Sequence, residues 1–167
     1  ASFVSPPDPI TAYPDDPEYM AQWGLDKIHA PEAWDLSTGS GQLIAVIDTG
    51  VDLDHVDLLT KTRTDIDWDF VNNDDTADDD HGHGTHVAGI AAAMTNNSLG
   101  VAGLGWDVEV LPLKILDASG NGYTDDLISA IQYATTYGAD VINISLGASM
   151  SCPSSIQGVI NTAHNAG

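Results

Sequence analysis

The sequence predicts an α/β fold, in which a central and mostly parallel sheet is flanked by helices. The first observation is the run of aliphatic residues at positions 43–47, which is typical of a strand buried on both faces and ends at Asp48. The second is the alanine- and glycine-rich stretch after His83, whose small side chains suit a closely packed helix. The third is the alternation of strand-like and helix-like segments along the chain, which indicates a parallel sheet with crossover helices.

The individual elements follow from proline positions and apolar periodicity. Residues 1–16 are rich in proline and poor in apolar side chains, so we expect an extended N-terminal arm. Pro17 and Pro31 suit the first helical position, which predicts short helices over residues 17–22 and 31–35. The longer elements expected are strands over residues 42–47, 108–115 and 141–144 and helices over residues 84–94, 124–137 and 155–164. Thr124 is the expected N-cap of its helix.

The composition is strongly acidic. The chain contains 4 Lys and Arg against 25 Asp and Glu, which gives a formal net charge of -21. A surface of this sign repels phosphate backbones and anionic membranes, so no nucleic-acid partner is expected. No apolar run approaches the roughly 18 residues of a membrane helix, so no membrane span is expected either. Short Asp carboxylates in turns are oxygen ligands that calcium prefers, so the acidic composition indicates either bound calcium as a cofactor or a saline habitat.

Two motifs contain the candidate chemistry. Asp48, followed by Thr49 and Gly50, ends a predicted strand, and open parallel sheets place functional side chains at this carboxyl edge. His83 lies at the exposed start of the next predicted helix, where Gly84 allows close packing. A carboxylate and an imidazole are the orienting group and the general base that nucleophilic hydrolases need.

These motifs resemble those of the subtilisin family of serine endopeptidases, and in particular its thermitase-like branch. The resemblance runs from about Pro14 to Gly167. The matching segments are residues 22–24, 30–34, 48–52, 55–58, 83–89, 96–103 and 141–147. The resemblance implies a subtilisin-like three-layer fold, in which residues 17–167 are the N-terminal part of a single catalytic domain of roughly 270 residues.

The resemblance implies that Asp48 orients His83 and that His83 is the general base of an Asp-His-Ser triad. The serine and the asparagine of the oxyanion hole would lie outside this chain, in the C-terminal remainder of the domain. The implied protein is a secreted, extracellular endopeptidase that hydrolyses protein or peptide substrates and loses a pro-segment on maturation.

A peptide-binding cleft is implied in the same way. Glycines let a substrate backbone approach, and an extended peptide would add as a strand between two segments of the chain. The residues implied in substrate binding are Leu116, Ser119, Gly120, Asn121, Gly122, Leu127, Ser145, Leu146 and Gly147. A plain turn and a plain strand are the alternative interpretation of these segments.

Two calcium sites are also implied by the resemblance. The first would join the N-terminal arm to the core through the side chains of Asp16, Asp57 and Asn97 and the backbone carbonyls of Met94, Leu99 and Val101. The second would use Asp69, Asp74, Thr76 and Asp78. Asn72 stands where the family pattern has an aspartate, which lowers the charge of the second ligand set. Asp79 and Asp80 fit two interpretations equally well, as acidic residues of a calcium-binding loop or as solvated charges.

Other interpretations of these motifs remain open. A catalytically inactive fragment or pseudoenzyme that binds peptide and calcium would contain the same residues. His81, His83 and His86 have the histidine spacing of zinc-dependent metallo-β-lactamases, so a metal-dependent hydrolase is a further alternative, although that motif has aspartate where Thr85 stands. The Asp-Thr-Gly sequence also occurs in aspartic proteases, which are nearly all-β proteins, and the alanine-rich helix argues against that fold.

Two residues near the C-terminus need separate interpretations. Ser149 lies in a sequence that imitates the nucleophile motif, but it follows directly on the strand predicted at residues 141–144, so we interpret it as an ordinary loop serine. Cys152 is the single cysteine of the chain, and it is either a free thiol or the partner of a cysteine elsewhere.

Overall fold

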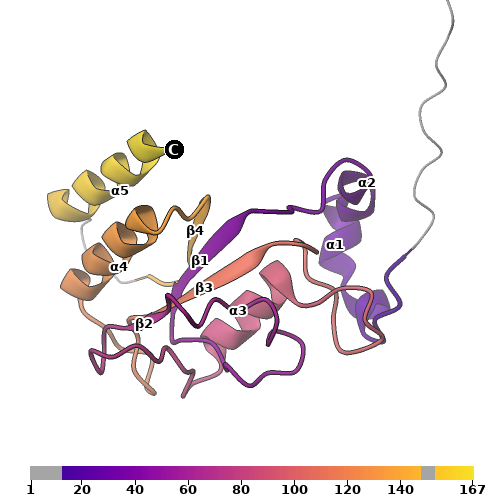
Figure 1. Ribbon diagram of the computed structural model, residues 1–167, viewed down its shortest axis with the longest axis horizontal. Coiled ribbons are helices and arrows are strands. Elements are labelled where there is room, and N and C mark those ends of the chain that lie inside the picture. The colour runs from indigo at the N-terminus through magenta and orange to yellow at the C-terminus, as the bar shows by residue number, and fades with distance from the viewer. Residues whose placement is uncertain (1–12, 148–152) are drawn as a thin grey trace, which may run out of the picture.

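A computed structural model describes residues 13–147 and 153–167, and Figure 1 shows its course. Within these residues the central sheet has the strand order β2-β3-β1-β4, and every pairing is parallel. The strands are β1 (Leu43–Asp48), β2 (Trp68–Asp69), β3 (Glu109–Lys114) and β4 (Val141–Ile144). The helices are η1 (Tyr19–Ala21), α1 (Trp23–Lys27), α2 (Ala30–Trp34), α3 (His83–Ala92), α4 (Thr124–Thr136) and α5 (Ser154–Ala166).

Helices cover both faces of the sheet, which explains why β1 is apolar from Leu43 to Ile47. Leu43, Ala45 and Ile47 point into a buried cluster that also contains residues of α4 and α5. Val46 points to the opposite face, where it packs in a second cluster with Ala88 of α3. Figure 1 shows α4 and α5 on one side of the sheet and α3 on the other. The three-layer α/β class predicted from the sequence is therefore confirmed.

The N-terminal helices form a hydrophobic cluster of their own, distinct from the two clusters on the faces of the sheet. Tyr19, Leu25, Ala30, Trp34 and Ala102 form a third buried cluster, which joins η1, α1 and α2 to the loop after α3. This packing fixes the segment that leads from the N-terminal arm into the core.

The longer elements lie where the sequence predicts them, with ends that differ by one or two residues. The helix α1 and the two-residue strand β2 were not predicted, and residues 17–22 contain only the 3₁₀ turn η1. The prediction that Thr124 caps α4 is wrong, because Tyr123 has the extended N-cap conformation and no side chain caps the helix. Asp125 and Asp126 nevertheless lie in the first turn, where carboxylates stabilise the positive end of the helix dipole.

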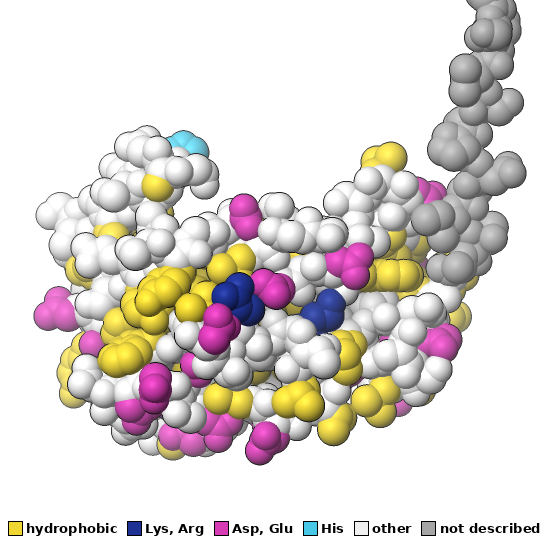
Figure 2. Space-filling view, in the orientation of Figure 1, with side chains coloured by type: hydrophobic (Ala, Val, Ile, Leu, Met, Phe, Trp, Pro, Cys, Tyr) yellow, Lys and Arg dark blue, Asp and Glu magenta, His cyan; other side chains and the backbone are white. Residues whose placement is uncertain are grey.

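Several expectations fall on residues that the structure does not describe. Residues 1–12 of the arm, together with Ser149 and Cys152, lie outside the described ranges. Among the described residues, no helix has the length and apolar character needed to cross a membrane. Figure 2 shows acidic side chains spread over the face drawn and few basic ones, in keeping with the net charge.

Candidate active site

Asp48 and His83 meet at the carboxyl edge of the sheet. Asp48 is the last residue of β1 and is fully buried, whereas His83 is the first residue of α3 and its side chain is 45% exposed. The Nδ1 atom of His83 lies 2.7 Å from Oδ1 of Asp48. With the proton on Nδ1 donated to this carboxylate, Nε2 is the nitrogen left to accept a proton from another group.

Gly50, which follows Asp48 by two residues, and Gly84, which follows His83 directly, allow the start of α3 to approach the end of β1. A Cβ on Gly84 would lie 2.1 Å from the carbonyl oxygen of Gly50 and 3.1 Å from Cβ of Asp48. Gly50 has a φ of 103°, and a Cβ there would lie 2.6 Å from the carbonyl oxygen of Ala77. Only residues without a side chain allow the start of α3 to lie against the end of β1.

A second aspartate, which the sequence did not distinguish from a solvated charge, joins these two ends. Asp79 accepts hydrogen bonds from the hydroxyl of Thr49 at 2.8 Å and from the amide of Thr85 at 3.0 Å. Burial by itself would raise the pKa of Asp79, but hydrogen bonds from Thr85, Gly82 and His81 lower it to about 2. This carboxylate is therefore ionised over the whole neutral pH range.

A buried lysine lies beside the same loop, and sequence reasoning missed it as well. Lys114 ends β3 opposite Asp48 and is 1% exposed. Its ammonium group donates to the carbonyl oxygen of Thr49 and to Asp80 Oδ1, both at 2.6 Å, and to the carbonyl oxygen of Leu116 at 3.0 Å. Asp80 is thus paired rather than simply solvated. A lysine within a predicted buried strand is the sequence signal for such a pair, because a buried ammonium group needs a partner.

The segments implied in substrate binding lie on both sides of Asp48. Residues 116–122 follow β3 and residues 145–147 follow β4, and these two strands are the neighbours of β1 in the sheet. Parallel strands end at the same edge, so both segments flank the Asp48 position. Leu116, Leu127 and Leu146 are partly buried against the core cluster on that side.

The turn at residues 119–122 is shaped by Asp117, another residue that the sequence analysis did not single out. Oδ1 of Asp117 accepts the amides of Ser119 and Asn121, both at 2.9 Å, and these hydrogen bonds lower the pKa of Asp117. Gly120 has a φ of 73°, and a Cβ there would lie 3.7 Å from Nε2 of His81. A Cβ on Gly122 would lie 2.2 Å from the carbonyl oxygen of Ile115. On the other side, Asn143 donates to the hydroxyl of Ser145, while no atom of the described residues lies within 4 Å of a Cβ built on Gly147.

The structure brings together the side chains of the first predicted calcium site. Asp16 is 4% exposed and accepts the amides of Asn96 and Asn97, at 2.8 and 3.3 Å. Asp57 is 3% exposed, and its carboxylate accepts hydrogen bonds from Nδ2 of Asn97 at 2.8 Å and from the amide of Val101 at 3.3 Å. The carbonyl oxygen of Asp57 accepts a hydrogen bond from the amide of Met94, and the amide of Leu99 donates to Oδ1 of Asn97 at 2.9 Å. Two buried carboxylates around one loop, which form no ion pair with a basic side chain among the described residues, fit a hard divalent cation.

The residues of the second predicted calcium site are gathered only in part. Asp69 and Asp74 exchange backbone hydrogen bonds at 2.9 and 3.1 Å, and Asp74 accepts the amide of Thr76. Asn72 occupies the Asp69 carboxylate, to which it donates from both its backbone and its side chain. Asp78 instead accepts the amide of Leu53. The four predicted ligands therefore do not converge in this conformation.

The histidines of the zinc alternative do not converge either. Across residues 13–147 and 153–167, no three or more His, Cys, Asp or Glu side chains form a group that could hold a metal ion. The rings of His81 and His83 have centroids 6.4 Å apart, and Nδ1 of His83 is occupied by Asp48. This donor set does not fit a three-histidine zinc centre.

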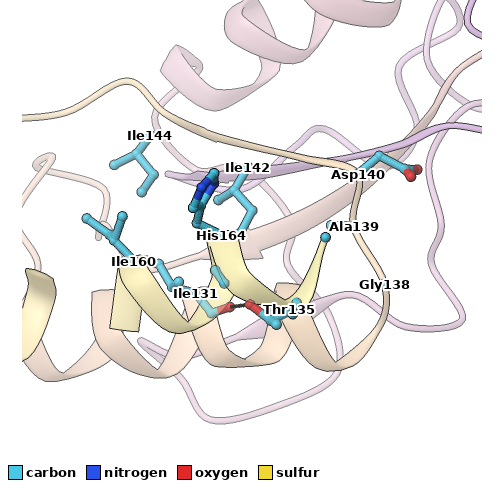
Figure 3. Close-up of a pocket in the computed structure, with 12 residues that line it drawn as sticks. Ile131, Thr135, Gly138, Ala139, Asp140, Ile142, Ile144, Ile160 and His164 are labelled. Carbon is cyan, nitrogen blue, oxygen red and sulfur yellow. Dashed lines mark hydrogen bonds between the residues drawn. The ribbon is translucent and has the colours of Figure 1, made fainter. Parts of the chain in front are cut away.

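A cavity of about 540 Å³ lies between β4, α4 and α5 (Figure 3). Its walls include Ile131 and Thr135 of α4, Ile142 and Ile144 of β4, and Ile160 and His164 of α5. None of the predicted site residues lines it. The cavity is therefore separate from the Asp48–His83 pair.

A buried carboxylate bonded to the Nδ1 atom of a half-exposed histidine, at the carboxyl edge of a parallel sheet, is the acid and base arrangement of nucleophilic hydrolases. The sequence profile of the subtilase family matches residues 39–167, and the chain belongs to this family of serine peptidases. Thermitase from Thermoactinomyces vulgaris is 46% identical over 155 residues, which cover 92% of this chain and 54% of thermitase. A protein named extracellular protease, from Xanthomonas campestris, is 35% identical and is covered over 34% of its length.

The fold agrees with solved structures of the family. A protease from Pseudoalteromonas arctica superposes with a TM-score of 0.84 at 34% identity, over 93% of this chain and 57% of that protein. The chain thus spans about half the length of thermitase and of this solved protease.

Proposed function

We propose that the chain is the N-terminal part of the catalytic domain of a secreted serine endopeptidase that hydrolyses peptide bonds through an Asp-His-Ser triad. The observation that carries this proposal is the 2.7 Å contact between Nδ1 of His83 and Oδ1 of the buried Asp48. The nucleophilic serine and the oxyanion-hole asparagine would come from the C-terminal remainder of the domain.

His83 is the general base of the proposed mechanism. Nε2 takes the proton of the serine hydroxyl as the oxygen attacks the carbonyl carbon of the scissile peptide bond, and it later gives this proton to the leaving amine. Asp48 holds the imidazole in the tautomer with the proton on Nδ1 and stabilises the imidazolium that forms. The acyl-enzyme is then hydrolysed by water, with His83 again as the base.

The substrate would bind as an extended strand between residues 119–122 and 145–147. Both segments flank Asp48 at the carboxyl edge of the sheet, and their glycines leave backbone groups accessible to a peptide. Leu116 and Leu127 would contribute apolar walls. This geometry favours unfolded or extended segments of protein substrates.

The C-terminal remainder of the domain is the proposed partner of this chain. Within the described residues β4 is an outer strand, and Val141 is 52% exposed. The cavity beside β4 is lined by isoleucines together with polar residues such as Asp140 and His164. An outer strand with such a hollow next to it is a surface that further parts of a domain would cover.

Calcium is the proposed cofactor, bound at the site formed by Asp16, Asp57, Asn97 and the carbonyl oxygens of the loop at residues 94–101. Calcium would neutralise two buried carboxylates there and join the N-terminal segment to the core. Its role would be stability rather than chemistry, because Asp16 and Asp57 bond to the loop that follows the C-terminal end of α3, whereas His83 lies at the N-terminal end of that helix. The second site, at Asp69, Asp74, Thr76 and Asp78, stays a prediction.

The function is tested by peptide hydrolysis with the full-length protein. His83→Ala is expected to lower kcat/KM by about 10²- to 10⁴-fold, because the general base is lost. His86→Ala, which removes an exposed histidine one helical turn away, is the matched control and is expected to keep activity. Equal activity of the two variants would contradict the proposal. A zinc chelator that abolishes the activity at once would support the metal-dependent alternative instead, and full-length protein without hydrolytic activity would support the pseudoenzyme alternative.

A further inference from the structure

Asp79 lies in the loop before α3, and its carboxylate is directed into the protein. Oδ1 accepts the hydroxyl of Thr49 at 2.8 Å and the amides of His81 and Gly82 at 3.0 and 2.9 Å. Oδ2 accepts the amide of Thr85 at 3.0 Å and its hydroxyl at 2.5 Å. Five donors on one carboxylate make it a structural centre rather than a solvated charge.

The partners of Asp79 are the chain neighbours of the acid and the base. Thr49 follows Asp48, and Gly84, which follows His83, donates its amide to the hydroxyl of Thr49 at 2.9 Å. The Thr49 hydroxyl therefore donates to Asp79 and accepts from the first turn of α3. The hydrogen bonds form a closed ring that connects the end of β1 with the start of α3.

The backbone of Thr49 is fixed from the other side. Lys114 donates to its carbonyl oxygen at 2.6 Å, and Thr49 is only 1% exposed. The residue has no freedom to turn its hydroxyl away from Asp79 without breaking buried hydrogen bonds. The hydroxyl of Thr85 also accepts the amide of Asp52 at 2.8 Å, so the loop after β1 is tied to the same carboxylate.

We propose that Asp79, acting through Thr49 and Thr85, is a positioning residue that holds His83 against Asp48. The proposal rests on the proposed function, because the pair that it positions is the acid and base of that reaction. Asp79 does not touch the reacting atoms. It fixes the start of α3 relative to the end of β1, and thereby the 2.7 Å contact between the two side chains.

Two variants of the full-length protein are designed to break this ring of hydrogen bonds in different ways. Asp79→Asn keeps the size of the side chain but replaces one accepting oxygen with a donating amide group. Thr49→Val removes the hydroxyl without changing any charge. Thr49→Ser keeps the hydroxyl and is the control for the second variant, while Asp54→Asn removes one exposed carboxylate from the loop after β1 and is the control for the loss of charge.

Kinetics give the first readout, with the active fraction counted by titration so that unfolded protein does not lower the rate. Asp79→Asn and Thr49→Val are each expected to lower kcat by about 10- to 100-fold with KM within about 3-fold, because misplacement of the base impairs the chemical step and not substrate binding. The double variant is expected to be no more than about 3-fold slower than the slower single variant, since both changes break one ring. Both control variants are expected to keep kcat within about 3-fold.

Proton NMR gives a readout that does not need hydrolysis. The proton on Nδ1 of His83 is expected to give a resonance protected from solvent exchange, and this resonance is expected to exchange faster in Asp79→Asn and Thr49→Val but not in the two controls. Unchanged exchange, or an unchanged kcat in the folded fraction of both variants, would overturn the positioning role. Absence of hydrolysis in the unsubstituted protein would overturn the proposed function instead, while the NMR comparison would still decide the role of Asp79.

Discussion

Gly84→Ala is expected to separate the acid from the base. The added Cβ would lie 2.1 Å from the carbonyl oxygen of Gly50. The position of a Cβ is set by its backbone and the oxygen belongs to the backbone, so no change of side-chain rotamer can relieve the clash. Because non-bonded heavy atoms rest about 3.5 Å apart, the start of α3 and the turn after β1 would have to separate by roughly 1 Å. That shift is enough to lengthen the 2.7 Å contact between His83 and Asp48 beyond the range of a hydrogen bond.

The magnitude follows from the same geometry. Overpacking of this kind costs about 1–3 kcal/mol of the free energy of unfolding, and misplacement of a reacting group by about 1 Å costs about 10²-fold in rate. The free energy of unfolding is measured by urea titration in the presence of a serine-protease inhibitor, which prevents autolysis. In a separate assay without inhibitor, kcat/KM is measured for a peptide substrate. Both quantities are expected to fall in Gly84→Ala.

Gly89→Ala on the same helix is the matched control. Nothing lies within 4 Å of a Cβ built on Gly89, so alanine there is expected to add about 0.5–1 kcal/mol of stability through its higher helix propensity and to leave kcat/KM unchanged. If Gly84→Ala behaved like Gly89→Ala, the close approach of α3 to β1 would not determine the site, and the reasoning would be refuted.

Three further predictions concern calcium, pH and the substrate cleft. Calcium at 100 times its Kd is expected to raise the free energy of unfolding by about 2.7 kcal/mol, and Asp57→Asn is expected to abolish this calcium dependence in thermal unfolding, whereas Asp54→Asn retains it; equal calcium dependence of both variants would refute the first site. Since the pKa of Asp79 is about 2 in the folded protein against an ordinary value of 3.8, its stabilisation is fully present above about pH 4 and is lost as the pH falls to about 2. After allowance for solvent screening this contribution is about 1 kcal/mol, and acid titration of Asp79→Asn should lack it, so an identical acid profile would contradict the assignment. Gly122→Ala is expected to raise KM for peptides by about 10-fold, because its Cβ would displace the carbonyl oxygen of Ile115, while Gly24→Ala, which meets no atom within 4 Å, should leave KM unchanged; equal KM values would argue against the cleft.

The sequence was sufficient to predict the core of the fold because periodicity and burial coincide there. The aliphatic run of β1 and the small residues of α3 have one plausible arrangement, in which helices cover both faces of a parallel sheet. The two residues of β2 form a strand only because β3 lies beside them, and no local pattern indicates this. Thr124 has the residue type of an N-cap, yet the extended conformation falls on Tyr123, so the local preference was overridden.

The candidate site was predicted in part for a similar reason. Asp48 and His83 stand at the ends of regular elements, where their sequence context distinguishes them. Asp79 stands among several aspartates of one loop, and its hydrogen bonds to Thr49 and Thr85 depend on three segments meeting in space. Lys114 was missed because its partners come from loops after other strands. Side chains that position a site are therefore harder to find from sequence than the side chains that they position.

In the proposed mechanism His83, oriented by Asp48, activates a serine nucleophile. The most direct test is the intact mass of the full-length protein under denaturing conditions, after treatment with an organophosphorus reagent that labels activated serines. One added label is expected on the unsubstituted protein and on His86→Ala, and no label is expected on His83→Ala within the same time. A protein that remains unlabelled, or a His83→Ala variant that is labelled at the same rate, would contradict the account.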